Sequence, residues 1–257
     1  MRSVINLGAL SLLCLFGSQP ANAQSEACHD QACAVKVASA EFIRPPVGAA
    51  AAPPGRCPGL LVDVSAGSAD EHRLVCSAAD TALQLLGRCS ITLRRPLQVQ
   101  IMSPVRHPLG GPVFGLFDIP REQVLVTKET NIPALVEGTP YARLPRSDFY
   151  RSLVVHEVVH GIMHQNLERK ATTHAAYEYP AYALQIASLP PGVREQFLRS
   201  FDQGAVGSDT LFSDAVLAFD PYFFAARAYH HFMSAPNGCA YLKSLLAGEV
   251  SFIAPPM

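Results

Sequence analysis

The twenty residues from Ser147 to Asn166, SDFYRSLVVHEVVHGIMHQN, contain an H-E-x-x-H motif whose two histidines are His156 and His160. Apolar residues surround this motif on nearly every side, so the pattern predicts a buried helix over about 148–165. Residues four apart lie one above the other on a helix, which places both imidazoles on one face, about 6 Å apart along the axis. Both can then bind one Zn²⁺ ion, which also relieves the cost of burying these polar groups.

The glutamate inside the motif has a different role. Glu157 is rotated about 100° from His156 around the helix, so it flanks the ion and can take a proton from a metal-bound water as general base. The alternative without a metal is a pair of core histidines with satisfied hydrogen bonds, beside a glutamate in a salt bridge. The desolvation argument favours the metal, and Glu157 is therefore the predicted catalytic residue.

A catalytic zinc site needs a third protein ligand. Glu178, 18 residues after the motif, stands at the opening of the next expected helix, where Pro180 is tolerated in a first turn. Glu178 is the preferred ligand, while His174, in a polar segment typical of a loop, and another carboxylate are the alternatives. His164 is excluded, because the eight residues between it and His156 correspond to about 12 Å along the axis.

Strand patterns precede the motif helix, and helix patterns follow it. Alternating apolar residues predict strands over 60–64, 97–102, 113–117 and 123–127, and the turn sequence at 118–121 joins the last two strands into a hairpin. Ser68 and Glu71 form a capping-box pattern that opens a helix ending at Gly87. Later helices are expected over 177–188, after 190–191, after 220–221 and over 237–247. This order predicts an α+β fold.

Composition limits the classes of function. The 257 residues are 49% hydrophobic, enough for the core of one domain, and 20 Lys and Arg against 21 Asp and Glu give a net charge of −1. A surface that binds nucleic acid needs clustered Lys and Arg, and the sequence has no such cluster. Nucleic acid is therefore excluded as an expected partner.

The first 23 residues match a cleavable signal peptide, with a basic start, an apolar run and Ala21-Asn22-Ala23 as the cleavage site. Residues 24–58 are expected to be a Pro- and Ala-rich lead-in, and a pro-segment is one interpretation of it. Residues 59–257 are the expected catalytic domain. No later stretch approaches the roughly 20 apolar residues of a membrane span. Lipidation of Cys14 is disfavoured, because Leu13 stands where a small residue is required. We therefore expect a periplasmic or secreted protein.

The cysteines fit an exported chain. Of seven cysteines, one lies in the predicted signal peptide, which leaves six in the mature chain and up to three disulfides among 15 possible pairings. Cys28 and Cys33 are close enough to bridge a local loop, and the other partners stay open. The alternative, a structural zinc site, lacks the C-x-x-C pair that such sites use.

An H-E-x-x-H helix with a glutamate on a following helix resembles the gluzincin branch of the zincin metallopeptidases. The stretch 60–252 also resembles an uncharacterised family of exported bacterial proteins with the same core. The resemblance implies a zincin-like fold with a small N-terminal mixed sheet, an active-site helix and a mainly helical C-terminal half. It also implies Zn²⁺ held by His156, His160 and Glu178, and hydrolysis of a peptide or protein substrate with Glu157 as base.

Further roles follow from this mechanism. Tyr229, His230 and His231 are candidates for stabilising the oxyanion, with Tyr229 preferred. Asp214 or Asp220 can orient the ligating imidazoles. In the gluzincin resemblance the substrate pairs with a sheet edge, which the hairpin at 113–127 can provide.

Two hypotheses compete with the metallopeptidase. The first is a catalytically inactive zincin-like binding module of the cell envelope, suggested by the many apolar residues and the absence of a recognisable specificity motif. The second is a disulfide-stabilised structural protein without metal.

Overall fold

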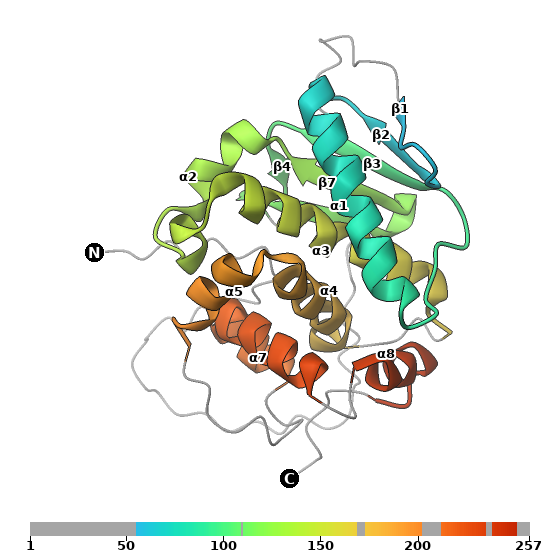
Figure 1. The fold of residues 1–257 in the computed structure, drawn as a ribbon, viewed down its shortest axis with the longest axis vertical. Helices are drawn as coiled ribbons and strands as arrows, with labels where there is room; N and C mark the ends of the chain where they lie inside the picture. The colour runs from blue at the N-terminus through green and yellow to red at the C-terminus, as the bar shows by residue number, and fades with distance from the viewer. Residues whose placement is uncertain (1–54, 109, 169–172, 202–211, 235–237, 251–257) are drawn as a thin grey trace, which may run out of the picture.

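The computed structural model describes residues 55–108, 110–168, 173–201, 212–234 and 238–250. The predicted signal peptide, the lead-in up to residue 54, and both Cys28 and Cys33 lie outside the described residues. The described chain has a small mixed sheet in its N-terminal half and a helical C-terminal half, as Figure 1 shows, so the predicted α+β class is confirmed.

A five-stranded sheet carries the N-terminal half, in the order β1-β2-β3-β7-β6. The strands are β1 (Gly55–Arg56), β2 (Val62–Ser65), β3 (Leu97–Met102), β7 (Gln123–Thr127) and β6 (Gly115–Asp118). β2, β3 and β7 run parallel, while β1 and β6 are antiparallel to their neighbours at the two edges. The antiparallel strand β6, next to β7, is therefore the edge strand at this end of the sheet.

Helices α1 (Ala69–Gly87) and α3 (Arg146–Asn166) pack against this sheet and against each other (Figure 1). Ser68 and Glu71 form the predicted capping box of α1, with Glu71 N donating to Ser68 Oγ at 3.2 Å. Gly161 lets α3 lie close to the sheet, because a Cβ at this position would be 2.7 Å from Leu97 Cδ1. The motif helix is thus held against β3, and almost all of it is buried.

The opposite face of the sheet has a smaller cover. β4 (Val105–Arg106) and β5 (Pro112–Val113) form a two-stranded ribbon. Val105 and Val113 pack there against Leu125 of β7, whereas Val124 and Val126 of the same strand belong to the main core. This alternation along β7 is the period of two that a strand covered on both faces requires.

The C-terminal half is built from helices that lie below α3 in Figure 1. They are α4 (His174–Ser188), α5 (Pro191–Leu198), α6 (Asp214–Phe219), α7 (Pro221–Met233) and α8 (Gly238–Ala247). α4 packs between α3 and α7, so it is the element that connects the motif helix to the rest of this half. The short helix α2 (Ile132–Val136) lies before α3. None of the helices in the described ranges is long and apolar enough to cross a membrane.

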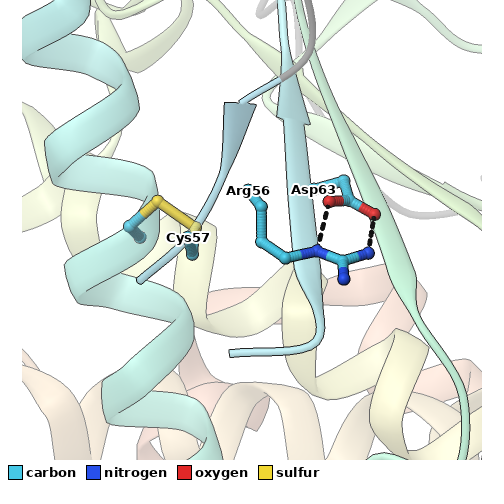
Figure 2. The surroundings of a disulfide bond; sticks show 4 residues. Arg56, Cys57 and Asp63 are labelled. Carbon is cyan, nitrogen blue, oxygen red and sulfur yellow. Dashed lines mark hydrogen bonds and ion pairs between the residues drawn. A yellow bond between two sulfur atoms is a disulfide. The ribbon is translucent and has the colours of Figure 1, made fainter. Parts of the chain in front are cut away.

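Two disulfides close the described part of the chain. Cys57–Cys76 ties the segment after β1 to α1, and Cys89–Cys239 ties the end of α1 to α8. Figure 2 shows the first of these beside the two-point contact in which Arg56 Nε and Nη2 donate to the carboxylate of Asp63 at 2.8 and 3.0 Å. The prediction of disulfides is confirmed for these two bonds.

Several details differ from the sequence expectations. The hairpin before α3 consists of β6 and β7, joined by the short 3-10 helix Ile119–Arg121, whereas Val113 pairs with Val105 in the separate ribbon. β1 lies inside the range expected to be lead-in, and it extends the sheet by one strand. Helix α6 was not expected from the sequence at all, because its six residues span fewer than two turns and show no clear period.

Candidate metal centre

The two motif histidines face each other on the buried side of α3. His156 Nε2 and His160 Nε2 are 3.1 Å apart, and the two side chains are almost fully enclosed. The helix keeps its regular hydrogen bonding through the motif, so the spacing of four residues alone brings both nitrogens to one point.

Glu178 reaches the same point from α4. Its Oε2 lies 3.3 Å from His156 Nε2, and its Oε1 lies 3.4 Å from His160 Nε2. The ligand atoms of the three residues all lie within 4.8 Å of one another, and all three residues are buried. The structure therefore brings together the three predicted metal ligands.

α4 begins earlier than the sequence pattern indicated. Thr173 caps the helix by accepting from Ala176 N at 3.2 Å, and Asp214 Oδ1 accepts from Ala175 N at 2.6 Å. Pro180 therefore lies inside the helix rather than in its first turn. The expectation that the helix starts near Glu178 is wrong by about one turn, because capping groups outside the periodic segment set its start.

The donor set suits a metal ion in its chemistry and closeness. His156 Nε2 and His160 Nε2 are 3.1 Å apart, near the roughly 3.3–3.4 Å that bonds of about 2.0–2.1 Å give in a tetrahedral site. Glu178 approaches the two imidazoles through different oxygens, and one ligand atom from each of the three residues lies within 4.8 Å of the other two. Glu178 Oε2 is fully buried and faces His156 Nε2 at 3.3 Å, so this carboxylate oxygen is directed at the imidazole nitrogens. Two imidazoles and one carboxylate are also the ligands that catalytic zinc uses in several hydrolases.

The charges of the cluster support the same arrangement. Burial alone would raise the pKa of Glu178, but the neighbouring imidazoles, His160 foremost, hold it well below its usual range. Burial lowers the pKa of His160, which favours its neutral form. For His156 burial acts in the same direction, yet the hydrogen bond and charge of Glu178 outweigh it and raise the pKa. An ionised carboxylate is thus present beside imidazoles that can serve as ligands once deprotonated.

Glu157 lies next to this cluster but is not part of it. Burial raises its pKa to about 7, with His156 opposing the shift and Glu178 adding to it. The edge strand β6 approaches the carboxylate closely at Gly115, where an added Cβ would be 2.6 Å from Glu157 Oε1. Gly115 therefore leaves the space that the Glu157 side chain occupies.

A small recess of about 40 Å³, partly open to solvent, lies beside Glu157. Aromatic and apolar side chains dominate its wall, and Glu157 is the one carboxylate among the described residues that line it. The lining residues are Phe114, Gly115, Tyr141, Leu153, His156, Glu157, Tyr182, Gln185, Pro221 and Tyr222. The Tyr182 ring packs edge-on against His156, with centroids 4.6 Å apart. His156 of the cluster and these aromatic side chains thus line the same recess.

His174, the alternative ligand, touches the cluster from outside. It is the first residue of α4, and its Nε2 lies 3.4 Å from Glu178 Oε1. It does not belong to the group of mutually close ligand atoms. His164 lies elsewhere, with Nε2 3.7 Å from Glu122 Oε1 and its ring against Phe117.

The expected oxyanion donors do not line the recess. Tyr229 packs against His230 and lies under the Arg194 guanidinium, 5.5 Å from its carbon. His231 is buried, with Nδ1 2.6 Å from the hydroxyl of Tyr179. These three positions on α7 therefore serve the packing of the helical half.

The two expected supporting carboxylates are helix caps. Asp214 caps α4, as described above, and Asp220 accepts from Tyr222 N and Phe223 N at the start of α7, at 3.0 and 2.9 Å. Sequence reasoning missed the residue that does contact a motif imidazole: Gln185 Oε1 lies 3.0 Å from His156 Nδ1. The available signal was its spacing, since seven residues after Glu178 is close to two helical turns.

The fold and the site together define an α+β protein that carries a buried cluster of two histidines and one glutamate, able to hold a metal ion. The chain belongs to a family of unknown function, DUF6639, whose family model matches residues 62–255. Neither a curated protein nor a solved structure matches the chain. The matched range includes both elements that form the cluster, α3 and α4.

Proposed function

We propose that this protein is an exported zinc metallopeptidase that hydrolyses peptide bonds. The observation that carries the proposal is the buried triangle of His156, His160 and Glu178, whose ligand atoms lie within 4.8 Å of one another and are of the types that catalytic zinc uses. The glutamate of the H-E-x-x-H motif, Glu157, lies next to this triangle without belonging to it. This position supports a hydrolase rather than a purely structural metal site.

A bound zinc ion supplies Lewis acidity and lowers the pKa of a coordinated water from 15.7 to about 7. The remaining work falls to the protein. The carboxylate of Glu157 lies beside the ligands and lines the recess, where it would accept a proton from the attacking water and return it to the leaving amine. Its placement against β6 keeps it beside the ligands without competing for the metal.

The strand β6 supports a peptide as substrate. It is the last strand of the sheet, hydrogen-bonded on one side to β7, and no described strand pairs with its other side. An extended peptide can add to such an edge through main-chain hydrogen bonds. Because Gly115 of β6 lies against Glu157, a peptide bound there brings its backbone close to the general base.

The recess supports a preference within that substrate class. Its apolar wall includes Phe114, Tyr141, Leu153 and Tyr222, and no lysine or arginine in the described part of the chain lines it. A side chain next to the cleaved bond would be held there by apolar burial, worth about 25 cal/mol per Å² of surface. We therefore expect cleavage beside aliphatic or aromatic residues.

The disulfides support a place outside the reducing cytosol. Two bonds close the folded chain, and such bonds persist in the periplasm and among secreted proteins. The signal-peptide pattern over residues 1–23 is the matching sequence feature.

The test combines metal analysis with a peptide-library digest. Purified protein is expected to hold about one zinc per chain, and Glu157→Gln to keep the zinc but lose hydrolysis by about 10²-fold or more. His156→Ala is expected to lose the metal, and His164→Ala, on the same helix but outside the cluster, to retain it. Hydrolysis by Glu157→Gln at the wild-type rate would remove Glu157 from its role.

The same experiment separates the competing hypotheses. Zinc without turnover on any library peptide would favour the inactive binding module. A wild-type protein that keeps no zinc after dialysis would leave only the metal-free structural protein.

A further inference from the structure

Among the described residues, Gln185 is the one whose side chain hydrogen-bonds the far nitrogen of a motif imidazole. Gln185 Oε1 lies 3.0 Å from His156 Nδ1, and Gln185 is only 2% exposed. It stands on α4 close to two turns after Glu178, so ligand and amide approach the cluster from the same helix.

This contact decides which nitrogen of His156 carries the proton. An amide oxygen only accepts hydrogen bonds, so Nδ1 must donate its hydrogen to Gln185. The neutral ring then carries its lone pair on Nε2, the atom that faces His160 and Glu178. The hydrogen bond thus selects the tautomer that can bind a metal and also fixes the rotation of the ring.

The second imidazole has no comparable support. His160 Nδ1 is buried and makes no hydrogen bond, and its ring instead stacks on Tyr177, with centroids 4.6 Å apart and an interplanar angle of 11°. A stacked ring is held in its plane but receives no acceptor for Nδ1. His156 is therefore the imidazole whose orientation depends on a specific polar partner.

The partner is an uncharged amide, which lines the same recess as Glu157 and lies next to the cluster that contains Glu178. We propose that Gln185 is a positioning residue, which presents Nε2 of His156 to the metal in the correct tautomer. This role rests on the metal site of the proposed function. Asp214 and Asp220, the two carboxylates expected from the sequence to orient the imidazoles, instead cap helices.

Three variants of the full-length chain test this role. Gln185→Met keeps the length of the side chain but removes the acceptor, and Gln185→Glu keeps an acceptor. Gln165→Met is the matched control: Gln165 is also buried, and its Oε1 accepts from Arg94 N and Arg95 N, away from the cluster. Zinc affinity is measured by competition with a chromogenic chelator, and site geometry by the visible absorption of the Co²⁺-loaded protein.

Loss of an outer partner of a metal-ligating histidine typically weakens metal binding by 10–100-fold, and we expect a loss of that size for Gln185→Met. Gln185→Glu should restore the affinity and the Co²⁺ spectrum, and Gln165→Met should leave both unchanged. The role is overturned if Gln185→Met binds zinc as tightly as wild type, or if both methionine variants lose affinity equally. A wild-type protein that binds no zinc would instead overturn the proposed function, and this role with it.

Discussion

Gly115→Ala offers a sharp test of how the edge strand places the general base. A Cβ at this position would lie 2.6 Å from both Cγ and Oε1 of Glu157, whereas ordinary contacts begin near 3.4 Å. The Glu157 side chain must therefore retreat by about 0.8 Å, while the strand itself tolerates alanine because the backbone of Gly115 is not in the left-handed region. The three heavy atoms nearest to the new methyl group all belong to Glu157 and not to a metal ligand.

A displacement of about 1 Å near the reacting atoms can lower the rate 10²-fold, which corresponds to about 2.7 kcal/mol in the activation free energy. We expect Gly115→Ala to keep one zinc per chain and to lose kcat by about that factor, as measured on the best peptide from the library. Gly192→Ala is the control, since a Cβ there has no neighbour within 4 Å. A variant with wild-type kcat, or one that loses its zinc, would refute the placement of Glu157 against β6.

Two further predictions concern stability. In the metal-free protein, burial on folding raises the pKa of Glu157 from 4.5 to about 7. Between these two pH values the folded state binds this proton and the unfolded state does not. The free energy of unfolding therefore falls by about 3 kcal/mol as pH rises through that window. Urea denaturation from pH 5 to 8 should show this slope in wild type and a reduced slope in Glu157→Gln; equal slopes would contradict the shift. Replacing Cys89 and Cys239 by serine should cost about 5 kcal/mol and replacing Cys57 and Cys76 about 3 kcal/mol, because the closed loops span 150 and 19 residues. Denaturation midpoints in the reverse order would contradict loop-closure entropy as the cause.

The elements that local pattern controls were predicted well. α3 extends only about two residues beyond its expected ends, because its apolar residues continue around the whole helix and no proline interrupts them. The capping box at Ser68 and Glu71 formed as expected, since both partners lie within four residues of each other. The spacing within H-E-x-x-H likewise placed its two imidazoles correctly, because helical geometry alone determines it.

The features that depend on distant residues were missed. The start of α4 is fixed in part by Asp214, 39 residues away in sequence, so Pro180 was assigned to the wrong turn. The sequence analysis expects carboxylates to orient the ligating imidazoles and so does not predict Gln185. The structure uses this neutral amide instead. The cysteine partners stayed open among 15 pairings, since only the packing of α8 near the end of α1 brings Cys239 to Cys89.

The order of the bonded cysteines has a consequence for maturation. Cys57 bonds to Cys76, and Cys89 bonds to Cys239, so each bond joins a cysteine to the next one along the chain. When a polypeptide is threaded N-terminus first into an oxidising compartment, an oxidase that couples thiols in order of arrival forms both of these bonds directly, provided that Cys28 and Cys33, which arrive first, pair with each other. No isomerase is then required to rearrange wrong pairs, although the Cys89 thiol must wait, unpaired, for a partner that arrives 150 residues later.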